Sequence, residues 1–152
     1  MIGYLIFAAA WVGLDQAVKY MVRASIPLHT SIPFLPGFDL TYIRNTGAAF
    51  SILSSQTWIL TALSGAATAV LLVLLVRRAL PTRLGMLSLS LLLAGAAGNL
   101  IDRVAFGWVT DMFQTTFMDF PVFNVADIGV VIGGVLLVLT VLFSGEKEEK
   151  KL

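Results

Sequence analysis

Residues 57–76 read TWILTALSGAATAVLLVLLV, a stretch without one charged side chain. About 20 apolar residues in a helix cross the hydrocarbon core of a bilayer, so this stretch predicts a transmembrane helix. The rest of the 152-residue chain agrees with it, since 58% of the residues are hydrophobic and 12% are charged. A soluble domain carries about 25% charged residues. The sequence therefore predicts an integral membrane protein.

Three further apolar segments surround this stretch. The four predicted spans cover about residues 2–21, 57–76, 84–101 and 125–143. Asp15 and Lys19 interrupt the first span and no basic region precedes it, so we predict a retained helix rather than a cleaved signal peptide. The predicted fold class is an all-α integral membrane protein with four transmembrane helices, forming a single domain over residues 1–152 with a tail at 144–152.

The basic residues are unevenly distributed among the connections. Six of the ten lie in the connection after the second span or in the tail. Because cytoplasmic connections are enriched in Lys and Arg, we predict that both termini and the tail are cytoplasmic. The connection at about 25–56 then lies outside, and its alternating segment 38–43 (FDLTYI) predicts a small extracytoplasmic β-element on the membrane surface between the first two helices.

Several kinds of chemistry are absent from the composition. The chain has no cysteine, and its single histidine, His29, lies in a proline-rich connection. Thiol nucleophiles, disulfides and two-histidine metal sites are therefore excluded, and we predict neither a metal nor a cofactor. The net charge is +1 and the basic residues form no stripe along the chain, so we predict no nucleic-acid partner.

Four of the six aspartates lie in or beside the predicted spans, where an ionisable side chain is costly and suggests a functional site. Asp111 follows the third span and Asp127 begins the fourth, so both belong to the same outer face. Two carboxylates that share a site do not both ionise cheaply, and such a pair can supply a general base and a general acid. Two separately solvated or helix-capping aspartates are the alternative.

The other two aspartates of this set have charged neighbours. Asp15 and Lys19 form an i,i+4 pair. Either the two charges only neutralise each other, or Asp15 also anchors the β-element. Asp102 can pair with Arg103, with Lys19 or with a backbone group, and it has Asn99 as its i,i+3 neighbour. The simplest interpretation of Asp102 is a structural ion pair.

Two more asparagines occur near the predicted site. Asn124 precedes Asp127 by three residues, which suits either a helix N-cap or a donor to a carboxylate. Asn45 lies beside small residues including Gly47, where its amide either contacts a substrate or stabilises a turn.

Five blocks of the chain, in order, resemble the lipoprotein signal peptidase family, also called signal peptidase II. They are LDQ at 14–16 with Lys19, RNTGAAFS at 44–51, GNLIDR at 98–103, VTD at 109–111 and FNVAD at 123–127. The resemblance implies that Asp111 and Asp127 are the catalytic aspartates. The positions that it implies to bind substrate or support the site are Asp15, Lys19, Asn45, Gly47, Asn99, Asp102, Arg103 and Asn124. Asp119, in the connection before the fourth span, is assigned no role.

The reaction implied by this resemblance is cleavage of a bacterial prolipoprotein on the N-terminal side of a diacylglyceryl-modified cysteine. The implied partners are this prolipoprotein and membrane lipid, and the implied location is the bacterial cytoplasmic (inner) membrane, with the active site near the outer face. We expect a monomer. From the residues alone, a proton- or cation-coupled carrier and an assembly protein that packs through its glycines are alternatives.

Overall fold

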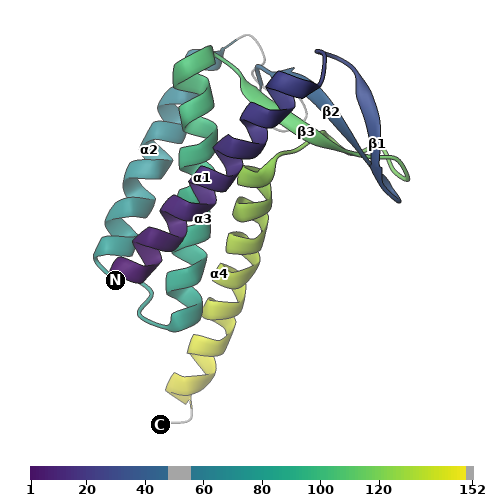
Figure 1. Ribbon diagram of the computed structural model, residues 1–152. Helices are drawn as coiled ribbons and strands as arrows, with labels where there is room; N and C mark the ends of the chain where they lie inside the picture. The colour runs from purple at the N-terminus through teal and green to yellow at the C-terminus, as the bar shows by residue number, and fades with distance from the viewer. Residues whose placement is uncertain (48–55, 150–152) are drawn as a thin grey trace.

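The computed structural model describes residues 1–47 and 56–149. Its elements, in chain order, are α1 (Ile2–Ser25), β1 (Ser31–Leu35), β2 (Phe38–Asn45), α2 (Thr57–Val76), α3 (Arg83–Phe106), β3 (Val109–Thr115) and α4 (Val125–Glu149). All four helices are long and apolar enough to cross a membrane, which confirms the predicted fold class. The sheet lies at one end of the helical bundle, and the start of α1 and the end of α4 lie at the other (Figure 1).

Three helices extend beyond the spans that hydropathy predicts. Helix α1 continues to Ser25 and α3 to Phe106, where Gly107 ends it with a φ of 80°. This left-handed conformation favours glycine, because it has no Cβ. Helix α4 continues to Glu149, so the first part of the predicted tail is helical, and 150–152 lie outside the described residues.

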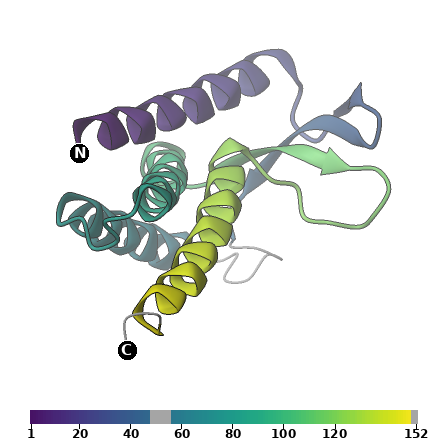
Figure 2. The same ribbon diagram turned by 90° about the horizontal axis from the view of Figure 1, so that it is seen from below.

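Helix α3 is the centre of the bundle and contacts each of the other three helices (Figure 2). Its membrane-crossing window is 56% buried, whereas that of α2 is 11% buried and faces outward. Small residues let α3 approach α4 closely: a Cβ on Gly95 would lie 2.5 Å from the Ala126 carbonyl oxygen. Van der Waals packing of this kind replaces the hydrophobic effect as the force between helices in lipid.

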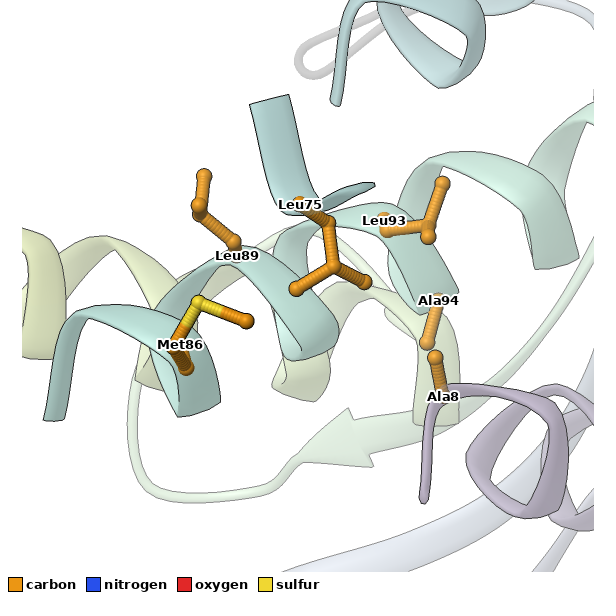
Figure 3. Close-up of a cluster of buried hydrophobic side chains, with 6 residues drawn as sticks. All are labelled: Ala8, Leu75, Met86, Leu89, Leu93 and Ala94. Carbon is orange, nitrogen blue, oxygen red and sulfur yellow. The ribbon is translucent and has the colours of Figure 1, made fainter. Parts of the chain in front are cut away.

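An apolar cluster joins three helices near the end of the bundle remote from the sheet. It consists of Ala8 from α1, Leu75 from α2 and four residues of α3, namely Met86, Leu89, Leu93 and Ala94 (Figure 3). The buried charged residues of the described chain, Asp15, Lys19, Asp102 and Asp111, lie toward the opposite end, next to the sheet. The cluster therefore holds the helices together at a distance from the candidate site.

The sheet has three antiparallel strands in the order β1-β2-β3. The predicted outer element at about 25–56 contains β1 and β2, while 48–55 lie outside the described residues. The third strand was not predicted and comes from the connection between α3 and α4. Its register pairs Asn45 with Val109 and Ile43 with Asp111, so β3 brings Asp111 to the strand that ends in Asn45.

Candidate active site

The chain folds back after β3 and returns to it before α4 begins. Phe123 forms an isolated bridge with Phe113, through N–H···O bonds of 3.1 Å and 2.8 Å, and its carbonyl also accepts the N–H of Met112 at 3.0 Å. This return brings Asn124 next to Asp111, although thirteen residues separate them in the chain. The first turn of α4 therefore starts beside the strand that carries Asp111.

Both carboxylate oxygens of Asp111 accept a side-chain amide. Asn45 Nδ2 donates to Oδ2 at 2.8 Å, and Asn124 Nδ2 donates to Oδ1 at 2.7 Å. Neither amide can be reversed, because each amide oxygen accepts a backbone N–H: Asn45 Oδ1 from Gly47 and Asn124 Oδ1 from Asp127, both at 2.9 Å. Asn45 thus stabilises a turn and binds the carboxylate at once.

Asp111 is 2% exposed. Burial raises the pKa of Asp111 to about 7, and the negative charge of Asp127 acts in the same direction, while the amides of Asn45 and Asn124 oppose both. Desolvation penalises the charged form of a carboxyl, so a proton stays on this group at pH values where an exposed aspartate has lost it.

Asp127 lies in the first turn of α4 and caps that helix together with Asn124. Asn124 Oδ1 accepts the Asp127 N–H, and Asp127 Oδ2 accepts the Asn124 N–H at 3.1 Å, which is the reciprocal arrangement of a capping box. The other oxygen, Oδ1, accepts Asn99 Nδ2 at 2.8 Å. A negative charge is favourable at a helix N-terminus, so this position suits an ionised carboxylate.

A buried group of charges lies behind the two carboxylates. Lys19 Nζ lies 2.8 Å from Asp15 Oδ2 and 3.7 Å from Asp102 Oδ2, and all three side chains are fully buried. The same ammonium donates to Asn99 Oδ1 at 2.9 Å. The predicted i,i+4 pair is therefore part of a larger group that reaches α3.

The two aspartates of this group each hold another element in place. Asp15 Oδ1 accepts the Ala126 N–H at 2.8 Å, so Asp15 anchors the start of α4 rather than the β-element. Asp102 Oδ2 accepts the Thr110 N–H at 2.8 Å, so Asp102 is the residue that ties β3 to α3. Together they fix the elements that carry Asp127 and Asp111.

Arg103 does not pair with Asp102, although the two are adjacent in the sequence. Its Nη1 donates to Ser64 Oγ of α2 at 3.1 Å, and its Nη2 lies 3.5 Å from the Gly47 carbonyl oxygen. Arg103 therefore connects α3 to α2 and to the residues that follow β2.

Two supporting residues were missed in the sequence. Gln16 Nε2 donates to Asp15 Oδ2 at 3.1 Å and to Asp102 Oδ1 at 3.2 Å, and Arg23 Nη1 lies 3.8 Å from Asp102 Oδ2. The sequence could have indicated both residues, because Gln16, Lys19 and Arg23 are spaced three and four residues apart on α1. Polar residues at that spacing lie on one helical face.

The two carboxylates border a cavity of about 1040 Å³. Its polar wall includes Asn45, Asn99, Arg103, Asp111, Gln114, Asp119 and Asp127. Its apolar wall includes Ile128, Val130, Val131 and Ile132 of α4. The cavity thus reaches from the sheet to the membrane-spanning part of α4. Within residues 1–47 and 56–149, no group of three or more His, Asp or Glu side chains is arranged to hold a metal ion.

Known proteins resemble this chain over most of its length. Residues 7–143 match the family described as Signal peptidase (SPase) II. The lipoprotein signal peptidase of Enterococcus faecalis is 41% identical over 152 residues, covering 99% of this chain and 94% of that protein. The enzyme of the same name from Streptococcus thermophilus is 45% identical over 131 residues, 86% of each chain.

Solved structures resemble the whole architecture. A bacterial membrane enzyme determined at 2.3 Å resolution by the in meso method superposes with a TM-score of 0.89 at 31% identity, covering 97% of this chain and 92% of the other. A second, at 1.9 Å resolution, gives 0.84 at 32% identity, covering 93% and 94%. Four membrane-crossing helices and a polar cavity at one end of them define a multi-pass membrane enzyme. The family match makes it a protease, and the chain belongs to the signal peptidase II family.

Proposed function

We propose that this protein removes the signal peptide from diacylglyceryl-modified prolipoproteins, and that Asp111 and Asp127 carry the reaction as an aspartic dyad. The observation that carries the proposal is the pairing of two carboxylates, both hydrogen-bonded to Asn124 and both bordering one cavity. Membership in the signal peptidase II family supports the substrate class.

In the proposed reaction Asp127 is the general base and Asp111 the general acid. Asp127 removes a proton from a water molecule, whose oxygen attacks the carbonyl carbon of the scissile bond, while Asp111 donates its proton to the carbonyl oxygen. When the tetrahedral intermediate collapses, the C–N bond breaks and the proton on Asp127 passes to the leaving amine. Asp111 takes back its proton from the hydroxyl oxygen. The environments support this division, because burial keeps a proton on Asp111 and Asp127 lies at a helix N-terminus.

The shape of the cavity supports a lipid-modified substrate. An apolar wall of α4 side chains meets a polar wall at the carboxylates, so a hydrophobic signal segment and its acyl chains can lie along α4 while the scissile bond faces the dyad. The mature part of the substrate would then extend toward the sheet. We place this end of the protein at the outer face of the cytoplasmic membrane, with both termini inside, because Arg77, Arg78 and Arg83 lie at the other end of α2 and α3.

The test is cleavage of a diacylglyceryl-modified prolipoprotein by the purified protein. The expected products are the free signal peptide and a mature chain that begins at the lipidated cysteine, identified by mass spectrometry. Cleavage at another bond, or equal cleavage of the unmodified precursor, would contradict the proposed substrate.

The rate should depend on pH through Asp111. The raised pKa means that Asp111 is protonated below about pH 7, so we expect kcat to fall as pH rises through about 7. Stability should change in the same direction: the folded protein holds a proton that the unfolded chain loses near pH 4, so the unfolding free energy decreases between about pH 4 and 7. Thermal unfolding of the wild type and Asp111→Asn over this range checks this, since the variant should lack that decrease.

A further prediction concerns Asp119, which was assigned no role from the sequence and borders the polar wall of the cavity with an exposed carboxylate. In the proposed substrate orientation it lies near the mature part. We expect a substrate with lysine after the lipidated cysteine to be cleaved about twofold to fivefold faster than one with aspartate at low salt, since exposed charges interact weakly. Asp119→Asn should remove the difference in kcat/KM, whereas Asp39→Asn, a change outside the cavity, should keep it.

A further inference from the structure

Lys19 is a fully buried cation that the proposed reaction does not use. Its ammonium has three oxygen partners, which are Asp15 Oδ2 at 2.8 Å, Asn99 Oδ1 at 2.9 Å and Asp102 Oδ2 at 3.7 Å. Buried ion pairs contribute little net stability, because desolvation offsets the attraction between the charges. Stability alone is therefore a weak reason for a lysine here. The uncharged partner of Lys19, Asn99, connects it to Asp127.

The orientation of the Asn99 amide depends on Lys19. An ammonium can only donate, so Asn99 must present Oδ1 to Lys19, and its Nδ2 then faces Asp127 Oδ1 at 2.8 Å. The other two asparagines of the site have their oxygens held by backbone N–H groups of Gly47 and Asp127. Of the three amides that donate to the dyad, Asn99 is the one whose orientation is held by a charged side chain.

Asn124 also donates to Asn99 Oδ1, but it is a weaker constraint. That contact is 3.1 Å, whereas the same Asn124 Nδ2 lies 2.7 Å from Asp111 Oδ1. Without Lys19, Asn99 can turn its amide and place a carbonyl oxygen against the Asp127 carboxylate. Two acceptors then face each other, which an ionised carboxylate disfavours and a protonated one accommodates.

We propose that Lys19 is a positioning residue of the peptidase site, which keeps Asp127 available as a base by fixing the Asn99 amide between the two. Lys19 reaches Asp127 through Asn99 and forms no hydrogen bond with either carboxylate of the dyad, although its charge also acts on Asp111. The inference rests on the proposed function, because it assigns Lys19 to the base of that reaction. It differs from a scaffolding role in one respect: the effect of Lys19 on the rate requires Asn99.

A double-mutant cycle tests this requirement with diacylglyceryl-modified prolipoprotein as substrate. We expect Lys19→Met to lower kcat about 10-fold to 100-fold with little change in KM, as for a group that acts on the chemical step. In an Asn99→Ala background the same substitution should lower kcat less than about threefold. An equal loss in both backgrounds overturns the proposal, since Lys19 then acts independently of Asn99.

Lys19→Met leaves Asp15 without its cation and leaves Asp102 with Arg23 alone, so the folding of this variant is checked by thermal unfolding. If this variant does not fold, Asp15→Asn replaces the wild type as the starting protein of the cycle. Adding Lys19→Met to it then removes one negative and one positive charge in all. The substituted asparagine keeps an oxygen for the Ala126 N–H that Asp15 accepts at 2.8 Å. A wild-type protein that cleaves nothing contradicts the proposed function itself, whereas normal cleavage without coupling contradicts only the role of Lys19.

Discussion

Replacing Asp127 with asparagine should lower the rate of signal-peptide removal at least about 10³-fold while the protein still folds and inserts. Asparagine has nearly the shape of aspartate but cannot accept the proton of the attacking water. Asp111→Asn should have an effect of similar size, because the amide has no proton to donate to the carbonyl oxygen as an acid. The measurement is single-turnover cleavage of a diacylglyceryl-modified prolipoprotein at saturating enzyme.

The control for both variants is Asp39→Asn. Asp39 lies on β2 opposite Pro33 and Gln114, and it does not border the cavity, so this change should leave the rate near that of the wild type. Each aspartate of the dyad accepts one N–H on each carboxylate oxygen, so the NH₂ group of a substituted asparagine must face one of these donors. This costs about 1–3 kcal/mol of stability. Thermal unfolding measures that loss separately from the rate. Wild-type cleavage by either folded variant would remove that aspartate from the proposed mechanism.

Gly95→Ala should damage the protein more than its one added methyl group suggests. The new Cβ would lie 2.5 Å from the Ala126 carbonyl oxygen and 2.5 Å from Val130 Cγ2. Because one of these atoms belongs to the backbone, α4 must move rather than a side chain. We expect a loss of about 1–3 kcal/mol and, since Ala126 precedes Asp127, a rate about 10-fold to 100-fold lower from misplacement of the base.

Gly134→Ala is the matched control, because it is the same substitution in a helix with no atom within 4 Å of the new Cβ. It should leave the rate unchanged and raise the melting temperature slightly, since alanine favours a helix by about 0.5–1 kcal/mol over glycine. The two variants are compared by thermal unfolding and by kcat. Equal behaviour of the two would show that the approach of α3 to α4 is unimportant for the site.

Hydropathy predicted the helices best where the span holds no charged residue. The span at 57–76 matches α2 at both ends, because Gln56 and Arg77 flank a run without a charged side chain. The spans predicted for α1, α3 and α4 were all shorter than the helices. For α1 and α3, the residues just beyond the predicted ends include Arg23 and Asp102, which look unsuitable for a membrane in sequence but bind each other and other groups in the fold.

Strand β3 was missed because its partner is distant in the chain. The segment 109–115 reads VTDMFQT, which contains β-forming residues, but the strand it pairs with precedes α2 and α3. The same limit applies to the candidate site. The local pair of Asp15 and Lys19 was predictable from its i,i+4 spacing, whereas the bonds from Ala126 to Asp15 and from Thr110 to Asp102 depend on how the elements pack.

The origin of the site from distant parts of the chain has a consequence for biosynthesis. A ribosome delivers the chain to the membrane from its N-terminus, and Asp111 emerges before the first turn of α4. Asn124 and Asp127, which complete the hydrogen bonds to Asp111 and Asn99, lie directly before and in the first turn of α4, so they emerge after α1, α2 and α3. A partly translated chain that ends before Asn124 therefore lacks the hydrogen-bonded pair of carboxylates, and under the proposed mechanism its peptidase activity begins only when the fourth helix enters the membrane.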